Sequence, residues 1–267
     1  MNLFQLSQDV EQYVIDMRRE FHANPEISFQ EKRTTARIRE ELDKIGIPHE
    51  TVGSGNVVAL FDTGRPGKSL AIRADIDALP MDEADKTTPY CSKVEGVMHS
   101  CGHDGHAAML LGTAKVLTQI KDQLKGKIYL CFQVAEEVGG GAGEIVEYLK
   151  QKGGVDGVIG THLDGGSDAG VIHLPDGPLM AGAQLFEIEV KGVGGHGSRP
   201  DKAVDPIKPA CDILLKIASI PAQYHNPFDT CVVSPCQIHG GSASNIIPES
   251  VKIGGNLRFF KYGDDEK

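Results

Sequence analysis

The sequence has no tryptophan, few aromatic residues and no long hydrophobic run among its 267 residues. A membrane-spanning helix needs about 18 uninterrupted apolar residues, and no stretch approaches that length. The first twenty residues carry Asp9, Glu11 and Asp16 among their apolar positions, which is unlike a signal peptide. We therefore expect neither a membrane anchor nor a secretory leader, and no membrane partner.

The sequence also has fewer basic than acidic residues. The 27 Lys and Arg side chains are outnumbered by 37 Asp and Glu, which gives a formal net charge of −10. Nucleic acids are bound through clustered Lys and Arg, so no nucleic-acid partner is expected. The six cysteines are scattered along the chain, without the density of a disulfide-rich secreted domain. This spacing favours a reducing, cytoplasmic location.

Apolar residues are plentiful enough for a large core, because 40% of the chain is hydrophobic. Up to about residue 180, helical and strand patterns alternate. The expected helices cover residues 8–21 (behind a Ser7 cap), 31–45, 106–120 and 142–151, and the expected strands cover residues 56–61, 69–72, 127–133 and 156–160. This alternation predicts that residues 1–180 form an α/β domain with a mostly parallel sheet and helices on both faces.

The pattern changes near residue 180. Phe186, Ile188 and Val190 alternate with charged residues, which is typical of a half-exposed strand. A helix over residues 205–220 and strands near 231–239 and 251–260 are expected to follow. We expect residues 181–267 to form a small α+β unit whose sheet is open on one side.

Residue types that can bind metals follow the expected strands of residues 1–180. In open α/β sheets, ligands lie beyond the carboxyl ends of the strands. Carboxylates, imidazoles and one thiol stand at or between three such ends: Asp75, Asp77, Cys101, His103, His106, Glu136, Glu137 and His162. Imidazole and thiolate suit Zn, Ni, Co or Mn to different degrees.

Each of these motifs has a simpler explanation when it is taken alone. The histidines near Cys101 could cap a helix, the paired glutamates could form a solvated loop, and His162 could be a core histidine. Their joint occurrence favours a metal site. Glu136 and Glu137 cannot both point the same way, so one can bind metal while the other acts as a general base. That division is the chemistry of metal-assisted hydrolysis.

Residues 181–267 also contain a group of polar residues. The glycine-rich segment Gly192–Pro200 can turn sharply and expose His196, and it lacks the ending of a phosphate-binding loop. His196, Asn245 and Arg258 together could hold a carboxylate or a developing oxyanion. Arg258 taken alone could equally be an ordinary surface arginine.

Seven ordered motifs resemble the aminoacylase and carboxypeptidase family of metallopeptidases, peptidase family M20. The nearest branch contains the amidohydrolases: aminoacylases, hippurate hydrolases, auxin-conjugate hydrolases and N-acetyldiaminopimelate deacetylases. The motifs cover essentially the whole chain, at residues 22–26, 71–80, 98–106, 133–137, 160–162, 192–200 and 242–248.

The resemblance implies a role for each candidate residue. The metal ligands would be Cys101, His103, Glu137 and His162, and Asp75 would orient one of them. Glu136 would be the general base that activates a metal-bound water, in a site that holds two divalent ions in a complete enzyme. His196 would stabilise the oxyanion in the partner subunit's site, and Asn245 and Arg258 would hold the substrate's carboxylate.

The same resemblance implies a zinc-peptidase-like catalytic domain, residues 1–180, and a ferredoxin-like lid, residues 181–267, that forms a homodimer. The expected substrate is a small N-acyl amino acid. Members of the family continue beyond the lid and supply one more histidine ligand, whereas this sequence stops at Lys267. The sequence therefore leaves three alternatives open: an amidohydrolase, an inactive C-terminally truncated fragment of one, or a peptidase of the same family that acts on small peptides.

Overall fold

The computed structural model describes residues 2–226, 228–261 and 263. The chain divides into two compact units, Met1–Ser167 and Asp168–Lys267. The sequence places the domain boundary near residue 180, in a segment that contains neither strand nor helix before Gly182. Among the described residues, no helix has both the length and the apolar character needed to cross a membrane.

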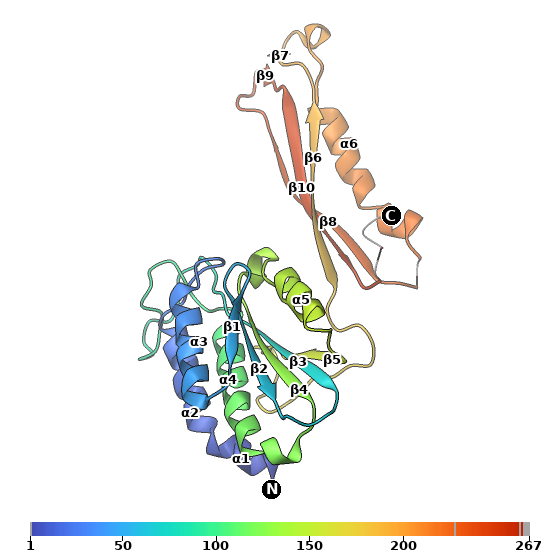
Figure 1. The fold of residues 1–267 in the computed structure, drawn as a ribbon. Coiled ribbons are helices and arrows are strands. Elements are labelled where there is room, and N and C mark those ends of the chain that lie inside the picture. The colour runs from blue at the N-terminus through green and yellow to red at the C-terminus, as the bar shows by residue number, and fades with distance from the viewer. Residues whose placement is uncertain (1, 227, 262, 264–267) are drawn as a thin grey trace. The chain divides into compact units, whose positions relative to one another are not determined.

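The first unit is an α/β fold whose helices lie on both faces of one five-stranded sheet (Figure 1). Its helices are α1 (Leu3–Asp9), α2 (Glu11–His22), α3 (Lys32–Ile45), α4 (His103–Gln119) and α5 (Ala142–Gln151), with short 3₁₀ turns η1 (Lys121–Gln123) and η2 (Glu136–Val138). Its strands are β1 (His49–Val52), β2 (Asn56–Asp62), β3 (Ser69–Asp75), β4 (Lys127–Gln133) and β5 (Gly157–Gly160).

The sheet has the order β1-β2-β4-β3-β5 and is mixed, which corrects the expectation of a mostly parallel sheet. β3 pairs in parallel with β4 and β5, whereas β1 pairs antiparallel with β2, and β2 antiparallel with β4. The three residues 53–55 join β1 to β2, and a connection this short permits only an antiparallel pair. The parallel half carries the ends at which we expected the site.

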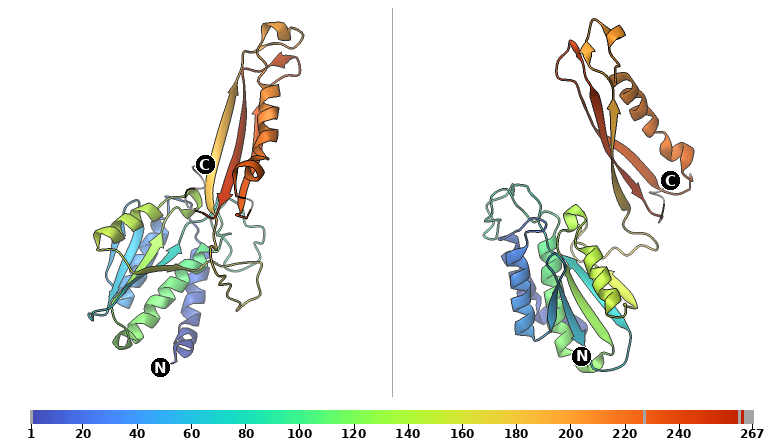
Figure 2. Two further views of the ribbon diagram at one scale, coloured as in Figure 1. Left: turned by 90° about the vertical axis from the view of Figure 1, so that its right-hand side faces the viewer. Right: turned by 45° about the horizontal axis from the view of Figure 1, so that its top comes forward.

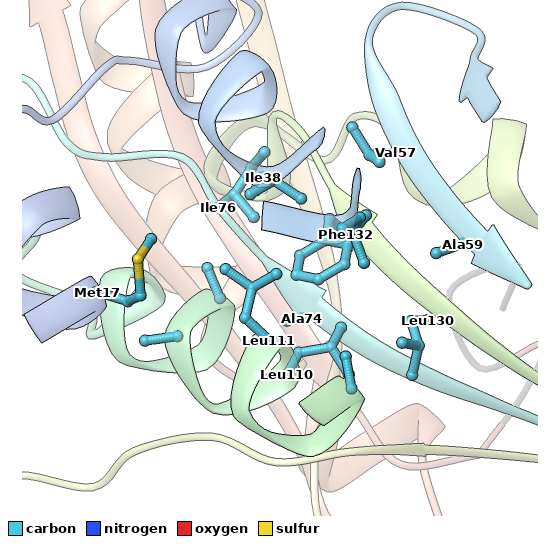
Figure 3. Packing of buried hydrophobic residues seen from close by; sticks show 14 of the residues in the cluster. Met17, Ile38, Val57, Ala59, Ala74, Ile76, Leu110, Leu111, Leu130 and Phe132 are labelled. Atoms are coloured by element: carbon cyan, nitrogen blue, oxygen red, sulfur yellow. The ribbon is translucent and has the colours of Figure 1, made fainter. Parts of the chain in front are cut away.

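Both faces of the sheet are buried, because neighbouring residues of β4 point in opposite directions. Leu130 and Phe132 pack with α2, α3 and α4 in the main core, while Tyr129 and Cys131 pack with α5 on the other face. Figure 3 shows the main core, where Leu110 and Leu111 of α4 lie against the sheet. The continuous apolar run of β4 therefore follows from its central position.

The N-terminal helix differs from the prediction in its start and in its continuity. The cap is Asn2, whose Oδ1 accepts a hydrogen bond from the Phe4 amide at 3.0 Å, and Ser7 lies inside α1. The helical run is broken at Val10, which ends α1 and precedes α2. The stop at Gly46 is confirmed, since this glycine adopts a left-handed φ of 83° after α3.

The second unit is an α+β arrangement with α6 along one face of a three-stranded antiparallel sheet (Figure 2). The sheet has the order β6-β10-β8, with β6 (Gly182–Lys191), β8 (Cys231–Gly240) and β10 (Ser250–Phe259). β7 (Gly195–His196) pairs with β9 (Ile246–Ile247), and η3 (Pro200–Lys202) follows β7. The helix expected over residues 205–220 is α6 (Ile207–Ile217), and a further short helix, α7 (Ile220–Tyr224), begins where the expected one ends.

The open face of that sheet follows from its alternating sequence. Ile188 and Val190 of β6 pack toward α6, together with Val251 and Ile253 of β10. Leu185, whose position in the strand puts it on the opposite face of β6, is 84% exposed. The predicted half-exposed strand is therefore confirmed as an element whose second face has no cover among the described residues of its own unit.

Candidate metal centre

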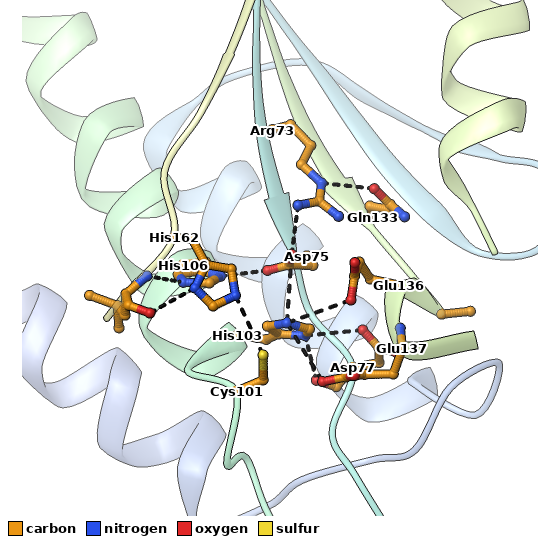
Figure 4. Close-up of polar contacts among 12 residues, drawn as sticks. Arg73, Asp75, Asp77, Cys101, His103, His106, Gln133, Glu136, Glu137 and His162 are labelled. Atoms are coloured by element: carbon orange, nitrogen blue, oxygen red, sulfur yellow. Dashed lines mark hydrogen bonds and ion pairs between the residues drawn. The ribbon is translucent and has the colours of Figure 1, made fainter. Parts of the chain in front are cut away.

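The candidate ligands of the first unit meet where β3, β4 and β5 end (Figure 4). Asp75 is the last residue of β3, and Glu136 opens the 3₁₀ turn that follows β4. His162 follows β5 by two residues, and His103 is the first residue of α4. The chain therefore brings together residues up to 87 positions apart (75 and 162) at one edge of the sheet.

His103 lies at the centre of this cluster. Its Nε2 is 3.6 Å from Asp75 Oδ2, 3.9 Å from Glu136 Oε2 and 3.8 Å from Glu137 Oε1. On another side, Cys101 Sγ lies 3.4 Å from His162 Nε2. Three sets of side chains bring their donor atoms within 4.8 Å of one another: Cys101, His103 and His162; Asp75, His103 and His106; and His103, Glu136 and Glu137.

Two buried atoms at this centre have no hydrogen-bond partner. They are His103 Nε2 and Glu137 Oε1, which lie 3.8 Å apart, beyond hydrogen-bonding distance. A buried polar atom without a partner costs about 1–3 kcal/mol. A cation between the two atoms would satisfy both, and the imidazole, carboxylate and thiol donors are those that a first-row divalent metal accepts. The residues present therefore fit a metal ion.

Asp77 fixes the orientation of His103 from behind. His103 Nδ1 lies 3.0 Å from the Asp77 carbonyl oxygen and 3.2 Å from Asp77 Oδ1. The other carboxylate oxygen of Asp77 accepts hydrogen bonds from Ser28 Oγ at 2.7 Å and from the Glu137 amide at 3.1 Å. Asp77 therefore links the helix that carries His103 to the turn that carries Glu137. The sequence marked Asp77 only by its position two residues after Asp75.

Asp75, expected to orient a ligand, contacts other groups more closely than it contacts His103. Its Oδ1 lies 2.5 Å from His106 Nδ1, and its Oδ2 lies 2.6 Å from Arg73 Nη1. His106 Nε2 in turn accepts a hydrogen bond from the Leu163 amide at 2.8 Å. Asp75 and His106 thus hold the backbone next to His162 in place. Arg73 was not among the expected residues, because a strand arginine gives no sequence signal of its own.

The electrostatics of the site favour a bound cation. Burial raises the pKa of the Cys101 thiol to about 11, and the negative charges of Glu137 and Glu136 add to that rise. Burial also raises the pKa of Glu137. Burial alone would raise the pKa of Asp77 as well, but the hydrogen bonds from His103 and Ser28 hold it below its usual value. A divalent ion would offset the excess of negative charge and stabilise the thiolate.

The polar cluster of the second unit is only partly formed. His196 lies on β7 opposite Ile246 of β9, and the Asn245 carbonyl oxygen accepts a hydrogen bond from the Gly197 amide at 2.7 Å. Arg258 instead pairs with Ala183 and lies near the far end of β10 from Ser250. Eight strand residues span about 26 Å. Within one chain, His196 and Asn245 are therefore neighbours, and Arg258 does not join them.

Comparison with known proteins identifies the family. The family model described as peptidase family M20/M25/M40 matches residues 71–244. An N-acyl-L-amino acid amidohydrolase of Geobacillus stearothermophilus is 41% identical over 96% of this chain and 69% of its own length. An N-acetyl-L-cysteine deacetylase of Bacillus subtilis is 42% identical over 94% of this chain and 60% of its own length. This chain thus spans about two thirds of the length of these relatives.

The fold leads to the same family. The crystal structure of the Bacillus subtilis YXEP protein, described as a dinuclear metal-binding peptidase from the M20 family, superposes with a TM-score of 0.80 at 35% identity. The match covers 97% of this chain and 67% of that one. The ordered motifs, the donor cluster and the fold agree, and the chain belongs to peptidase family M20/M25/M40.

Proposed function

We propose that this chain carries the catalytic centre of a metal-dependent amidohydrolase that cleaves the amide bond of N-acyl amino acids or related small conjugates. The observation that supports it most is the pair of unpartnered buried atoms, His103 Nε2 and Glu137 Oε1, beside a more exposed Glu136. The names of the relatives at 38–42% identity, which include an amidohydrolase and two deacetylases, indicate the bond type.

Cys101, His103, Glu137 and His162 would hold the metal, and two divalent ions, chosen from Zn, Mn, Ni or Co, fit the mixed donor set. When bound, such ions supply Lewis-acid chemistry, which polarises an amide carbonyl and makes water more acidic. Asp77 keeps His103 Nε2 directed at the site by holding its Nδ1. Asp75, through His106, steadies the backbone beside His162.

Glu136 would act as the general base. Its side chain is 40% exposed, whereas that of Glu137 is 19% exposed with one oxygen buried. Glu136 is thus the more accessible of the two carboxylates to solvent. In hydrolysis, the water oxygen bonds to the acyl carbon while Glu136 takes one water proton. The carbon–nitrogen bond then breaks as Glu136 returns that proton to the leaving amine.

The second unit would serve as the lid and as the dimer interface, with residues 1–180 as the catalytic domain. His196 is exposed at the β7–β9 pair and would donate to the developing oxyanion in the partner's site. Asn245 beside it and Arg258 on β10 are too far apart within one chain to hold one carboxylate, so they would hold the substrate's carboxylate from different subunits of the dimer. A cytoplasmic location fits the scattered cysteines.

A peptidase activity is the second candidate, because a thermostable carboxypeptidase of Saccharolobus solfataricus is 42% identical over 94% of this chain and 64% of its own length. The two activities differ in whether an acyl group or an amino acid lies on the carbonyl side of the cleaved bond. A substrate panel therefore separates them.

The test is an assay of the full chain, loaded in turn with Zn²⁺, Mn²⁺, Co²⁺ and Ni²⁺, on N-acetyl amino acids, N-benzoyl glycine and dipeptides. We expect release of free amino acid from the N-acyl substrates and a loss of about 10²-fold or more in kcat for Glu136→Gln. Faster cleavage of dipeptides would favour the peptidase. Equal inertness of the wild type and the variant would favour an inactive fragment.

A further inference from the structure

A buried glutamate outside the donor cluster contacts the turn that carries the general base. Glu31 precedes α3 and is only 3% exposed. Its Oε1 accepts a hydrogen bond from the backbone amide of Ala135 at 2.8 Å. Burial raises the pKa of the Glu31 carboxyl, and hydrogen bonds from the backbone amides of Glu31 itself, Ala135 and Phe29 only partly oppose that rise. Burial of a carboxylate costs free energy, so a glutamate at this position indicates a role beyond packing.

Two of the residues whose backbone amides donate to Glu31, Phe29 and Ala135, have a left-handed backbone conformation. Phe29 has a φ of 63° and Ala135 a φ of 58°, and in the described part of the chain these are the residues other than glycine with positive φ. For a residue with a Cβ atom, this conformation costs about 1–2 kcal/mol. It persists only where neighbouring groups hold it, and such sites cluster at functional centres.

The left-handed residue at 135 decides where the glutamates point. Ala135 is fully buried and directly precedes Glu136, the first residue of the 3₁₀ turn. Its own carbonyl oxygen accepts from the Gly140 amide at 2.7 Å, which closes the turn. On the preceding side, Val134 donates its amide to Asn56 Oδ1 at 3.0 Å. Glu31 is thus the side chain that accepts the hydrogen bond from the amide of Ala135, the residue with the left-handed backbone conformation.

The segment before Glu31 also contacts Asp77, the residue behind His103. The Ala78 amide donates to the Glu26 carbonyl oxygen at 2.9 Å, and Ser28 Oγ donates to Asp77 Oδ2 at 2.7 Å. Residues 26–31 therefore contact both the carboxylate that orients His103 and the turn that presents Glu136. One short segment sets the spacing between these two parts of the site.

We propose that Glu31 is a positioning residue that holds the left-handed turn at Ala135 and thereby directs Glu136 toward the substrate and Glu137 toward the metal. This inference rests on the proposed function for its catalytic part. Its structural part, the placement of Glu137, concerns metal binding alone and is measurable without turnover.

The first experiment compares Glu31→Gln with the wild type and with Glu147→Gln, a control on the exposed surface of α5. Glutamine keeps the shape, but one end of its side chain is an NH2 group that cannot accept, so the hydrogen bonds from the amides of Ala135, Glu31 and Phe29 cannot all be kept. We expect kcat for an N-acetyl amino acid to fall about tenfold to a hundredfold with little change in KM, because a misdirected base slows chemistry more than binding. The melting temperature should change little, since a buried charge is also removed. Retention of kcat within about twofold of the wild type would overturn the proposal.

The second experiment uses a rescue that only the positioning role predicts. Glycine adopts positive φ without strain, so Ala135→Gly placed in the Glu31→Gln chain should restore kcat at least about threefold over the single variant. If the loss in Glu31→Gln came from general damage to the fold, glycine would add flexibility and lower kcat further. Absence of rescue would therefore contradict the role assigned to Glu31.

A titration with Zn²⁺ alone separates this inference from the proposed function. We expect Glu31→Gln to raise the Zn²⁺ dissociation constant about threefold or more, because Glu137 lies in the same turn, while Glu147→Gln leaves it unchanged. If the wild type hydrolyses none of the substrates, the proposed function fails and this titration still decides. An unchanged dissociation constant would then overturn the role of Glu31.

Discussion

His103 has two ring nitrogens in contrasting surroundings, and that contrast organises the site. Nδ1 is held by the carbonyl oxygen and the carboxylate of Asp77, whereas Nε2 is buried without a partner. Burial alone would lower the pKa of His103, but the hydrogen bond to Asp77 and the charges of Asp75 and Asp77 raise it. The same carboxylates that would favour a proton on this ring would favour a metal ion in front of it.

Removal of the charge behind His103 should weaken the metal site. For Asp77→Asn we expect the Zn²⁺ dissociation constant to rise about 10–100-fold, because the ring loses the partner that fixes its orientation. Isothermal titration calorimetry measures it. Asp43→Asn is the matched control, since the Asp43 side chain is 75% exposed and belongs to none of the three donor sets. Equal affinities of the two variants would show that Asp77 does not orient the ligand.

Glu41 on α3 gives a separate prediction for stability at acidic pH. Its carboxylate accepts from Tyr13 Oη at 2.8 Å and lies 2.6 Å from Arg37 Nη1. Burial alone would raise the pKa of Glu41, but the hydrogen bonds from Lys44 and Tyr13 and the charge of Arg37 lower it. Since the folded pKa lies below the unfolded value, the stabilisation is complete above the unfolded pKa and is lost as the pH falls through the folded pKa.

Glu41→Gln should therefore lower the free energy of unfolding at pH 7 by about 1–3 kcal/mol, and the difference from wild type should shrink below about pH 4. Urea denaturation at pH 7 and pH 3 measures both values. Glu40→Gln is the control, because Glu40 meets the same Arg37 and Lys44 at an exposed position where ion pairs contribute little. If the difference in the free energy of unfolding between wild type and Glu41→Gln is larger at pH 3 than at pH 7, the stabilisation does not come from the ionised Glu41.

At the scale of elements, the site depends on how helices and strands end. α3 ends at a left-handed Gly46 after which the chain enters β1, and η2 begins after a left-handed Ala135. α4 begins at His103, behind a left-handed Gly102. The functional side chains thus stand at, or within two residues of, the ends of regular elements, where the backbone changes direction.

Two glycines in the first unit test the conformational part of this view. A Cβ atom at either Gly46 or Gly143 would meet no atom within 4 Å, but only Gly46 has a positive φ, of 83°. We expect Gly46→Ala to destabilise the protein by about 1 kcal/mol and Gly143→Ala, inside α5, to stabilise it by up to about 1 kcal/mol. Thermal denaturation of both variants measures the pair. Changes of the same sign would mean that φ is not the deciding factor.

The elements that the sequence predicts well have unambiguous local signals. β4 has the expected bounds because its apolar run Lys127–Gln133 is central in the sheet, and α3 ends at a glycine. β1, His49–Val52, was missed because only Val52 is buried and the strand has no alternation to detect. The break at Val10 was missed because neither glycine nor proline marks it.

The site could be predicted in outline for a comparable reason. Its donors stand at strand ends, and strand ends are visible in the sequence. The contacts of Asp77 and Glu31 could not be predicted, since they depend on which backbone amides two distant segments present to them. The separation of Arg258 from His196 follows from strand register, which the sequence pattern leaves undetermined.

At the scale of the whole molecule, the chain is two units joined by a segment without helix or strand. Residues 161–181 lie between β5 and β6, and nearly all are exposed. By contrast, the loop over residues 79–100 is bound to its surroundings: Lys93 donates its amide to the Ala23 carbonyl oxygen at 3.0 Å, and Glu83 Oε1 lies 3.1 Å from His22 Nε2. The two long loops therefore differ in their attachment.

Limited proteolysis with subtilisin should reveal this difference. We expect the first cut within residues 164–180 and fragments that match the two units by mass spectrometry, because exposed and weakly attached loops are nicked first. Zn²⁺ should slow cleavage on the His162 side of the segment, since that residue would be a ligand. A first cut within residues 79–100 would contradict the assignment of this segment as the boundary.

The central claim is that adjacent glutamates divide two tasks, and the Zn²⁺ dissociation constants of Glu136→Gln and Glu137→Gln, measured side by side on the full chain, test it most directly. Glu137→Gln should bind Zn²⁺ about tenfold or more weakly, because an unpartnered buried oxygen is removed from the donor set. Glu136→Gln should bind Zn²⁺ within about threefold of the wild type, because its loss affects proton transfer. Equal weakening in both variants, or weakening in Glu136→Gln alone, would contradict the account.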